Sequence, residues 1–199
     1  MSTVFTAWGY PMSLLEVLGF LTSALGVGLS IFGPRSTWPW WAISSALYGY
    51  FYIETKYYGS AALQIIFIAG GIWGWFGWGK EGAIPGKLSQ RARAITIVAY
   101  FVAWLGLSSF LIARGAAASK TDAFCVIGSC IAQYLMVKEK FEAWPLWFIV
   151  DSVYTYQFLQ GKYYLTTILY VLFVLMAIAG WRRWLQKAYS VKNSEVVLK

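Results

Sequence analysis

The chain has 199 residues, of which 59% are hydrophobic and 12% are charged, so its surface cannot be mainly water-facing. Several apolar runs approach the ~20 residues that cross a bilayer as a helix, which predicts a polytopic, all-α membrane protein. The net charge of +8 arises in predicted loops and the tail, which favours membrane topology over a nucleic-acid partner. Histidine, the commonest metal ligand and general base, is absent, and no metal, cofactor or catalytic residue is predicted.

Seven helices are predicted in chain order, at residues 13–32, 39–53, 60–78, 94–113, 119–137, 145–159 and 163–184. The first begins at a capping box formed by Ser13 and Glu16 and ends at Gly33-Pro34. Asp122 is expected to cap the fifth helix in the same way. Cys125 and Cys130 lie on that helix about 140° apart, so they are predicted to be free thiols.

The segments between and after the helices are polar. The connector 79–93 is basic and contains glycine and proline residues that prevent regular structure. The short loop 138–142 is expected to be solvated, and the chain after Gln186 is expected to fray. No cleavable signal peptide is predicted, because the first dozen residues lack a basic segment.

One stretch of the sequence occurs twice, without a gap, at an offset of 106 residues. Its motifs and their repeats are Trp38-Pro39-x-Trp41 and Trp144-Pro145-x-Trp147, Lys56-Tyr57-Tyr58 and Lys162-Tyr163-Tyr164, and Gly74-Trp75-x-x-Trp78 and Gly180-Trp181-x-x-Trp184. Tryptophan is rare in most chains, so this fixed offset indicates a duplicated unit. The prediction is two three-helix repeats joined by a linker helix, a 3+1+3 arrangement.

Seven crossings would place the two termini on opposite sides of the membrane. One side would hold four basic residues, Lys56, Arg114, Lys120 and Lys162, and the other side the remaining twelve, Lys199 among them. The positive-inside rule then predicts an extracytoplasmic N-terminus and a cytoplasmic C-terminus. The expected segments are 1–12 outside, the first repeat 13–78, the loop and linker helix 79–118, the second repeat 119–184 and the cytoplasmic tail 185–199.

A three-helix unit repeated directly would be inverted in the membrane. The extra crossing made by the linker helix gives the second unit the same direction as the first, so the two units are predicted to be parallel repeats. Such repeats are related by an axis along the membrane normal, and transporters built this way place their substrate between the repeats. We therefore expect a binding site near the middle of the membrane.

Asp151 is the predicted centre of that site. It lies six residues past Pro145, about 9 Å into the membrane, where a carboxylate costs at least ~2.5 kcal/mol. It should therefore face a polar cavity or a partner, although an interhelical hydrogen bond or a protonated acid is the alternative. Trp147 and Tyr154 share its helix face. The equivalent face of the second helix presents Trp41, Ser45 and Tyr48.

Other polar and aromatic side chains complete the candidate set. Gln64 and Gln133 lie well inside apolar runs and could bind hydroxyl or amide groups, or could serve helix packing instead. Gln157 lies nearer the outer end of its helix and ranks lower. Four tryptophans could mark the membrane interface or stack a flat ligand, namely Trp75, Trp78, Trp181 and Trp184.

Several motifs together resemble those of the PnuC-type vitamin transporters, over roughly residues 13 to 186. They are Ala61-Ala62-Leu63-Gln64, Gly74-Trp75-x-x-Trp78, Ala132-Gln133-Tyr134-Leu135, Lys140-Phe141-Glu142-x-Trp144, Lys162-x-Tyr164-Leu165 and Gly180-Trp181-x-x-Trp184. The resemblance implies uptake of nicotinamide riboside across the bacterial inner membrane by facilitated diffusion, with trapping by cytoplasmic phosphorylation. It also implies a fold related to the SWEET sugar transporters and a homotrimer.

Alternatives remain at this point. Members of the same family carry thiamine or riboflavin, and the related fold carries small sugars. An enzyme is disfavoured, because the sequence lacks histidine, a paired carboxylate and a phosphate-binding glycine loop. A channel is disfavoured because the polar residues are sparse and clustered.

Overall fold

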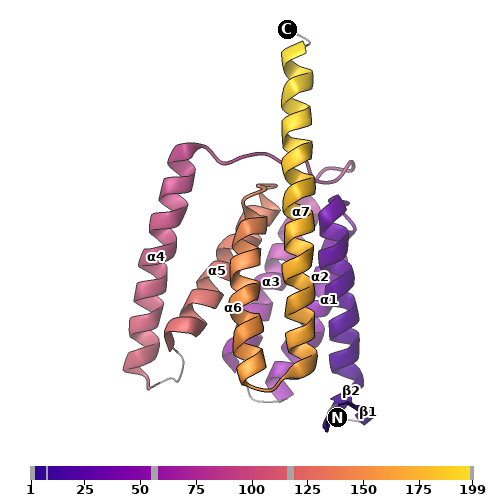
Figure 1. Ribbon diagram of the computed structural model, residues 1–199, viewed down its shortest axis with the longest axis vertical. Helices are drawn as coiled ribbons and strands as arrows, with labels where there is room; N and C mark the ends of the chain where they lie inside the picture. The colour runs from indigo at the N-terminus through magenta and orange to yellow at the C-terminus, as the bar shows by residue number, and fades with distance from the viewer. Residues whose placement is uncertain (1–2, 8, 55–57, 116–118, 198–199) are drawn as a thin grey trace.

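The computed structural model describes residues 3–7, 9–54, 58–115 and 119–197. Lys56, Tyr57 and Lys199, which enter the predicted repeat or the charge count, lie outside the described residues. Within the described part the chain forms seven helices, which Figure 1 shows as an elongated bundle: α1 (Leu14–Phe32), α2 (Thr37–Glu54), α3 (Tyr58–Gly77), α4 (Gln90–Ala113), α5 (Ser119–Val137), α6 (Ala143–Gln160) and α7 (Tyr164–Val197). A short antiparallel hairpin of β1 (Thr3–Ala7) and β2 (Tyr10–Ser13) precedes them.

The helices lie close to where the sequence places them, and the first one shows why. The Ser13 side chain accepts from the Glu16 backbone amide, and the Glu16 carboxylate accepts from the Ser13 amide at 2.9 Å. At the other end Gly33 adopts the left-handed conformation with φ of 78°, and its amide donates to Leu29. The predicted capping box is confirmed.

Several boundaries differ from the predictions, and α4 begins at Gln90 instead of residue 94, inside the predicted connector. Helix α7 continues to Val197, which corrects the predicted end at residue 184, and residues 185–197 contain neither glycine nor proline to interrupt it. The N-terminal segment is a β-hairpin, so the chain is not purely helical.

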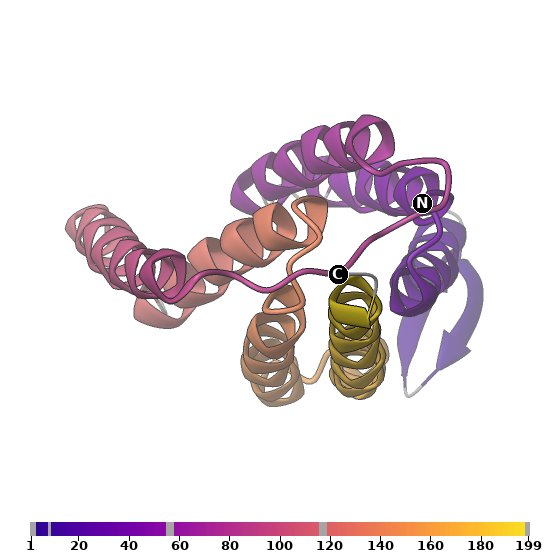
Figure 2. The same ribbon diagram turned by 90° about the horizontal axis from the view of Figure 1, so that it is seen from above.

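The bundle is built from neighbouring helices in contact. Helix α1 packs against α2 and α7, α2 against α3, and α6 against α7. Helix α5 contacts α3, α4 and α6, while α4 stands at the side of the bundle against α5 (Figure 2). The connector between α3 and α4 runs across one end of the bundle.

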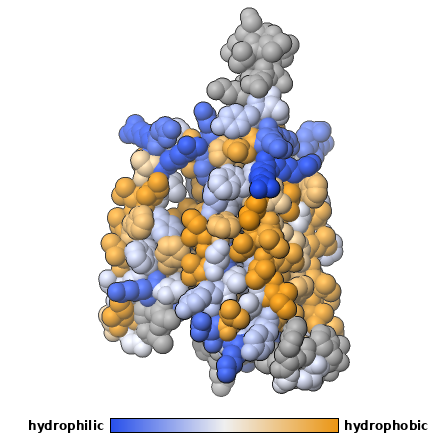
Figure 3. All heavy atoms as spheres, viewed as in Figure 1, coloured by the Kyte–Doolittle hydropathy of each residue, from blue (hydrophilic) through white to orange (hydrophobic). Residues whose placement is uncertain are grey.

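Three helical segments of the described chain are long and apolar enough to cross a membrane, namely Leu14–Phe32, Gln90–Ala113 and Tyr164–Ser190. Ala61–Gly77 is a shorter apolar stretch. Helices α2 and α6 carry the polar residues Ser44, Ser45 and Asp151, and all three side chains are buried. Figure 3 shows a broad apolar belt with hydrophilic residues gathered at the end from which α7 emerges.

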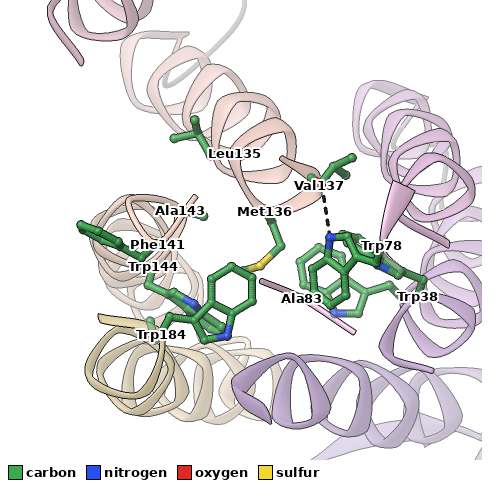
Figure 4. Close-up of a cluster of buried hydrophobic side chains, with 12 residues drawn as sticks. Trp38, Trp78, Ala83, Leu135, Met136, Val137, Phe141, Ala143, Trp144 and Trp184 are labelled. Carbon is green, nitrogen blue, oxygen red and sulfur yellow. Dashed lines mark hydrogen bonds between the residues drawn. The ribbon is translucent and has the colours of Figure 1, made fainter. Parts of the chain in front are cut away.

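Four tryptophans form the core at that end of the bundle (Figure 4). Each is 1% exposed: Trp38, Trp78, Trp144 and Trp184. Trp78 donates from Nε1 to the Val137 carbonyl at 3.2 Å, and Trp184 donates to the Ser30 carbonyl at 3.0 Å. These two residues therefore pack in the interior of the protein rather than facing lipid or solvent.

The connector between α3 and α4 is tied to the same end of the bundle. Ala83 donates its amide to the Gly33 carbonyl at 2.7 Å, and Gly86 donates to the Glu139 carbonyl at 2.8 Å. The Glu142 carboxylate accepts from the Leu88 amide and forms a 2.6 Å salt bridge with an Arg93 nitrogen. Glu142 is thus a structural link, which corrects the expectation of a solvated loop.

Candidate functional site

A cavity of about 160 Å³ lies inside the bundle between the two halves of the chain. Helices α1, α2 and α3 contribute residues to one side of it, and α5, α6 and α7 contribute to the other. Its lining includes pairs of residues related by the offset of 106: Ser23 and Ser129, Trp41 and Trp147, Ser45 and Asp151, Tyr48 and Tyr154, Tyr52 and Phe158, Leu63 and Leu169, Gln64 and Tyr170, and Phe67 and Phe173. The duplicated sequence positions therefore meet around one cavity.

Two tryptophans face each other across this junction. The rings of Trp41 and Trp147 lie edge to face, with centroids 5.9 Å apart and an interplanar angle of 72°. Trp144 lines the cavity and also packs against Trp184, at a centroid distance of 5.6 Å. The tryptophan core of Figure 4 thus adjoins the cavity at the end from which α7 emerges.

Aromatic side chains form much of the remaining wall. Tyr170 packs against Tyr154 at 4.9 Å and stacks on Phe158 at 5.2 Å between ring centroids. On the other side Tyr48 and Tyr52 stack at 6.1 Å. Flat apolar surfaces with hydroxyl groups at their edges suit a ligand that combines a ring with polar substituents.

Serine hydroxyls hold two of these tyrosines in equivalent ways. Ser23 of α1 hydrogen-bonds the Tyr48 side chain, and Ser129 of α5 hydrogen-bonds that of Tyr154. The two interactions are related by the same offset of 106. They fix both phenol rings at the cavity wall.

Asp151 breaks the symmetry of the cavity. Its counterpart Ser45 is neutral, and Asp151 is the one carboxylate in the described lining, which contains no lysine or arginine. Asp151 is 5% exposed, and the one salt bridge among the described residues joins Arg93 and Glu142 elsewhere. A buried carboxylate without a cation is costly, so Asp151 either meets positive charge brought by a ligand or holds a proton.

Most predicted site residues line this cavity, and three do not. Those that line it are Gln64, Trp41, Ser45, Tyr48, Trp147, Asp151 and Tyr154. Trp75 is 37% exposed with the Arg35 guanidinium 4.2 Å above its ring, and Trp181 is 41% exposed. Neither lines the cavity, so the structure does not support the expectation that they stack a ligand there.

Gln133 is the third exception. It is 2% exposed and packs where α5 meets α3, so close to Gly70 that a Cβ there would lie 2.7 Å from its amide nitrogen. Among the described residues neither polar atom of its amide has a hydrogen-bond partner. Its position supports the helix-packing interpretation over direct contact with the cavity.

Polar residues at the far end of α5 and α6 pair with each other. Gln157 donates from Nε2 to the Asp122 carboxylate at 2.6 Å. Asp122 therefore bridges two helices in addition to lying in the first turn of α5. Both cysteines are free, as predicted, and no cluster of potential metal ligands occurs in the described chain.

Several lining residues were missed by the sequence analysis, notably Ser23, Ser129, Tyr170 and Phe158. The duplication contains a signal that could have found Tyr170, because it is the counterpart of Gln64. Phe158 is the counterpart of Tyr52, but neither stands in a recognised motif.

Comparison with known proteins places the chain in a family. The family described as nicotinamide mononucleotide transporter matches residues 13–186. The chain belongs to this family. It is thus a membrane-embedded, multi-pass transporter, and the resemblance to PnuC-type proteins is confirmed.

The similar proteins are named for different substrates, nicotinamide riboside in one case and riboflavin or roseoflavin in another. The chain is 24% identical to the nicotinamide riboside transporter PnuC of Escherichia coli, over 92% of this chain and 89% of that protein. It is 29% identical to the riboflavin/roseoflavin transporter RibM of Streptomyces davaonensis, over 85% of this chain and 81% of that protein. The crystal structure of the vitamin B3 transporter PnuC matches with a TM-score of 0.77 and 21% identity, over 88% of this chain and 82% of that one, which establishes a shared fold.

Proposed function

We propose that this protein transports nicotinamide riboside across the membrane by facilitated diffusion. The observation that supports it most directly is Asp151, a buried carboxylate without a cation in an aromatic cavity. Nicotinamide riboside carries a permanent positive charge on its pyridinium ring, so it supplies the charge that this cavity lacks. The homologous PnuC transporter bears the same substrate in its name.

The lining favours the riboside over the mononucleotide that gives the family its description. A 5′-phosphate carries roughly −1.5 to −2 charges at pH 7. The described lining offers no lysine or arginine to such a phosphate, and Asp151 would repel it. The phosphorylated form is therefore a poor ligand, which is consistent with trapping of the riboside by cytoplasmic phosphorylation.

The remaining lining groups match the other parts of the substrate. Trp41, Trp147 and the tyrosines offer ring faces for the pyridinium, where cation–π attraction adds to area burial. Gln64 both donates and accepts hydrogen bonds and suits the ribose hydroxyls or the carboxamide. Ser45, on the neutral half, is available to the same groups.

The proposed architecture is seven membrane crossings in two parallel three-helix repeats joined by α4. The reciprocal contacts of Trp78 with Val137 and of Trp184 with Ser30 support it, since each tryptophan bonds the opposite half of the chain. In this arrangement the tryptophan core closes the cavity toward the end where α7 emerges. The C-terminus lies in the cytoplasm, the N-terminus lies outside the inner membrane, and the assembled protein is a homotrimer.

Riboflavin is the second candidate, because RibM is similar over most of this chain. Riboflavin is neutral and gains nothing from the Asp151 charge, so the cavity supports it less. A small sugar is disfavoured on the same ground. Thiamine is cationic and aromatic, and the charge of Asp151 does not separate it from nicotinamide riboside.

Counterflow in proteoliposomes tests the proposal. Vesicles loaded with unlabelled nicotinamide riboside should accumulate the labelled compound from outside without ATP or an ion gradient. Riboflavin, thiamine and nicotinamide mononucleotide loaded in parallel vesicles measure selectivity. Uptake that requires an imposed proton or sodium gradient would contradict the passive mechanism, and exchange only in riboflavin-loaded vesicles would replace the substrate.

A further inference from the structure

A second cavity of about 370 Å³ lies at the end of the bundle from which α7 emerges. Its walls come from the end of α1, the connector between α3 and α4, and the part of α7 beyond the tryptophan core. Phe32 and Pro85 form an apolar side, while Arg183, Lys187 and Ser190 form a polar side. The groove shares no lining residue with the transport cavity, and Trp184 of the groove packs on Trp144 of the cavity.

The polar side of the groove carries uncompensated positive charge. Arg183 and Lys187 are four residues apart on one face of α7, a spacing at which like charges repel. No carboxylate forms a salt bridge with either of them in the described part of the chain. Arg183 lies over the Phe32 ring at 4.6 Å, and Lys187 donates from Nζ to the Ala83 carbonyl at 2.6 Å. Both cations are therefore held at the groove by contacts that leave their charge unbalanced.

The apolar side continues into a stripe along α1. Phe32 is 61% exposed, and four further residues of the same helix are exposed at spacings of three or four: Leu14, Leu18, Leu21 and Leu25. The groove thus joins an apolar side that continues along α1 to a polar side on α7. A molecule that fits both sides has an anionic head and a hydrocarbon tail.

We propose that this groove binds an anionic phospholipid. The headgroup phosphate lies between Arg183 and Lys187, where charge-assisted hydrogen bonds are available. The acyl chains follow Phe32 and the exposed leucines of α1. A bound lipid joins α7 to α1 and the connector, and it neutralises the repulsion between the two cations.

The duplication indicates that the first repeat has no equivalent of this site. The positions 106 residues before Arg183 and Lys187 hold Gly77 and Glu81, which provide no cationic pair. The groove is therefore a feature of the second repeat, and it is independent of which substrate the transport cavity takes.

The test compares thermal unfolding of purified protein in detergent with added phosphatidylglycerol or phosphatidylcholine. The groove variant is R183Q/K187Q, and the matched control is K80Q/R182Q, which removes the same charge from exposed residues outside the groove. Phosphatidylglycerol should raise the midpoint of the wild type and the control by roughly 2–6 °C, and it should raise that of the groove variant by less than half as much. A second variant, S190E, places a carboxylate in the groove while keeping both cations, and it should show the same loss.

Three results would overturn the proposal. Equal stabilisation of the groove variants and the control would indicate attraction to general surface charge. Equal effects of the two lipids would remove the role of the anionic head. Stabilisation by inorganic phosphate or a nucleoside 5′-monophosphate, but not by phosphatidylglycerol, would assign the groove to a soluble phosphate instead.

Discussion

At the scale of single residues, the difference between Ser45 and Asp151 is the one that places an acidic group in the described lining of the cavity. Ser45 and Asp151 occupy equivalent positions, and both are buried, at 4% and 5% exposure. Only Asp151 can offset a positive charge, so the two halves of an otherwise similar cavity differ electrostatically. We expect this difference to orient a cationic ligand in the proposed site.

Replacing Asp151 with asparagine should weaken binding of nicotinamide riboside. A unit charge pair about 5 Å apart at an effective dielectric of ~20 is worth roughly 3 kcal/mol before desolvation. Desolvation removes much of this, so the expected net loss is about 1–2 kcal/mol, or roughly five- to thirtyfold in affinity by calorimetric titration. Ser45→Ala serves as the control and should lose less. Binding by D151N within about twofold of wild type would assign Asp151 to packing.

The same substitution should change selectivity between the riboside and its phosphate. In the wild type the mononucleotide should compete poorly with labelled nicotinamide riboside, because Asp151 repels its phosphate. In D151N the ratio of the two inhibition constants should shrink at least severalfold, while S45A should keep the wild-type ratio. An unchanged ratio in D151N would mean that something other than charge rejects the phosphate.

At the scale of helices, close packing at glycine joins α3 to α2 and α7 to α6. A Cβ at Gly74 would lie 2.1 Å from the Trp38 ring, and a Cβ at Gly180 would lie 2.5 Å from the Trp144 ring. Small residues of this kind let membrane helices approach closely. The two contacts are related by the offset of 106, so each repeat holds its tryptophan in the same way.

Gly74→Ala and Gly180→Ala should therefore destabilise the protein by about 1–3 kcal/mol each through overpacking. Gly106→Ala in α4 is the matched control, because a Cβ there meets no atom within 4 Å and alanine favours the helix. Thermal unfolding in detergent should show lower midpoints for the first two variants and an equal or higher midpoint for G106A. Midpoints at or above wild type for G74A and G180A would contradict this packing.

At the scale of the whole molecule, the distribution of charge predicts the direction of insertion. Arg35, Arg183 and Lys187 lie near the end from which α7 emerges, whereas Arg114 lies at the opposite end of α4. Basic residues are retained on the cytoplasmic side during insertion. The long extension of α7 should therefore project into the cytoplasm.

Cysteine labelling in intact cells measures this orientation. In a background with Cys125 and Cys130 replaced by serine, Ser194→Cys should resist a membrane-impermeant thiol reagent until the cells are permeabilised. Arg114→Cys, at the exposed C-cap of α4, should be labelled in intact cells and serves as the control. Labelling of S194C from outside, with protection of R114C, would reverse the topology.

The sequence alone determined the class of the protein, its helices and its repeats. Composition and run length identify a helical membrane protein because the bilayer demands long apolar helices. The offset of 106 identified the residues that meet at the cavity, such as Trp41 with Trp147, because duplicated units occupy equivalent places. Asp151 was recognisable because a carboxylate within an apolar helix is costly.

The tertiary structure decided which face of each helix turns inward. Trp75 and Trp78 belong to one motif, yet Trp75 is 37% exposed and Trp78 is 1% exposed. Gln133 and Gln64 are both glutamines within apolar helices, and only Gln64 lines the cavity. In a soluble helix the apolar stripe marks the inner face, but lipid is as apolar as a protein core, so hydropathy cannot separate the two faces. Only the contacts between helices make that distinction.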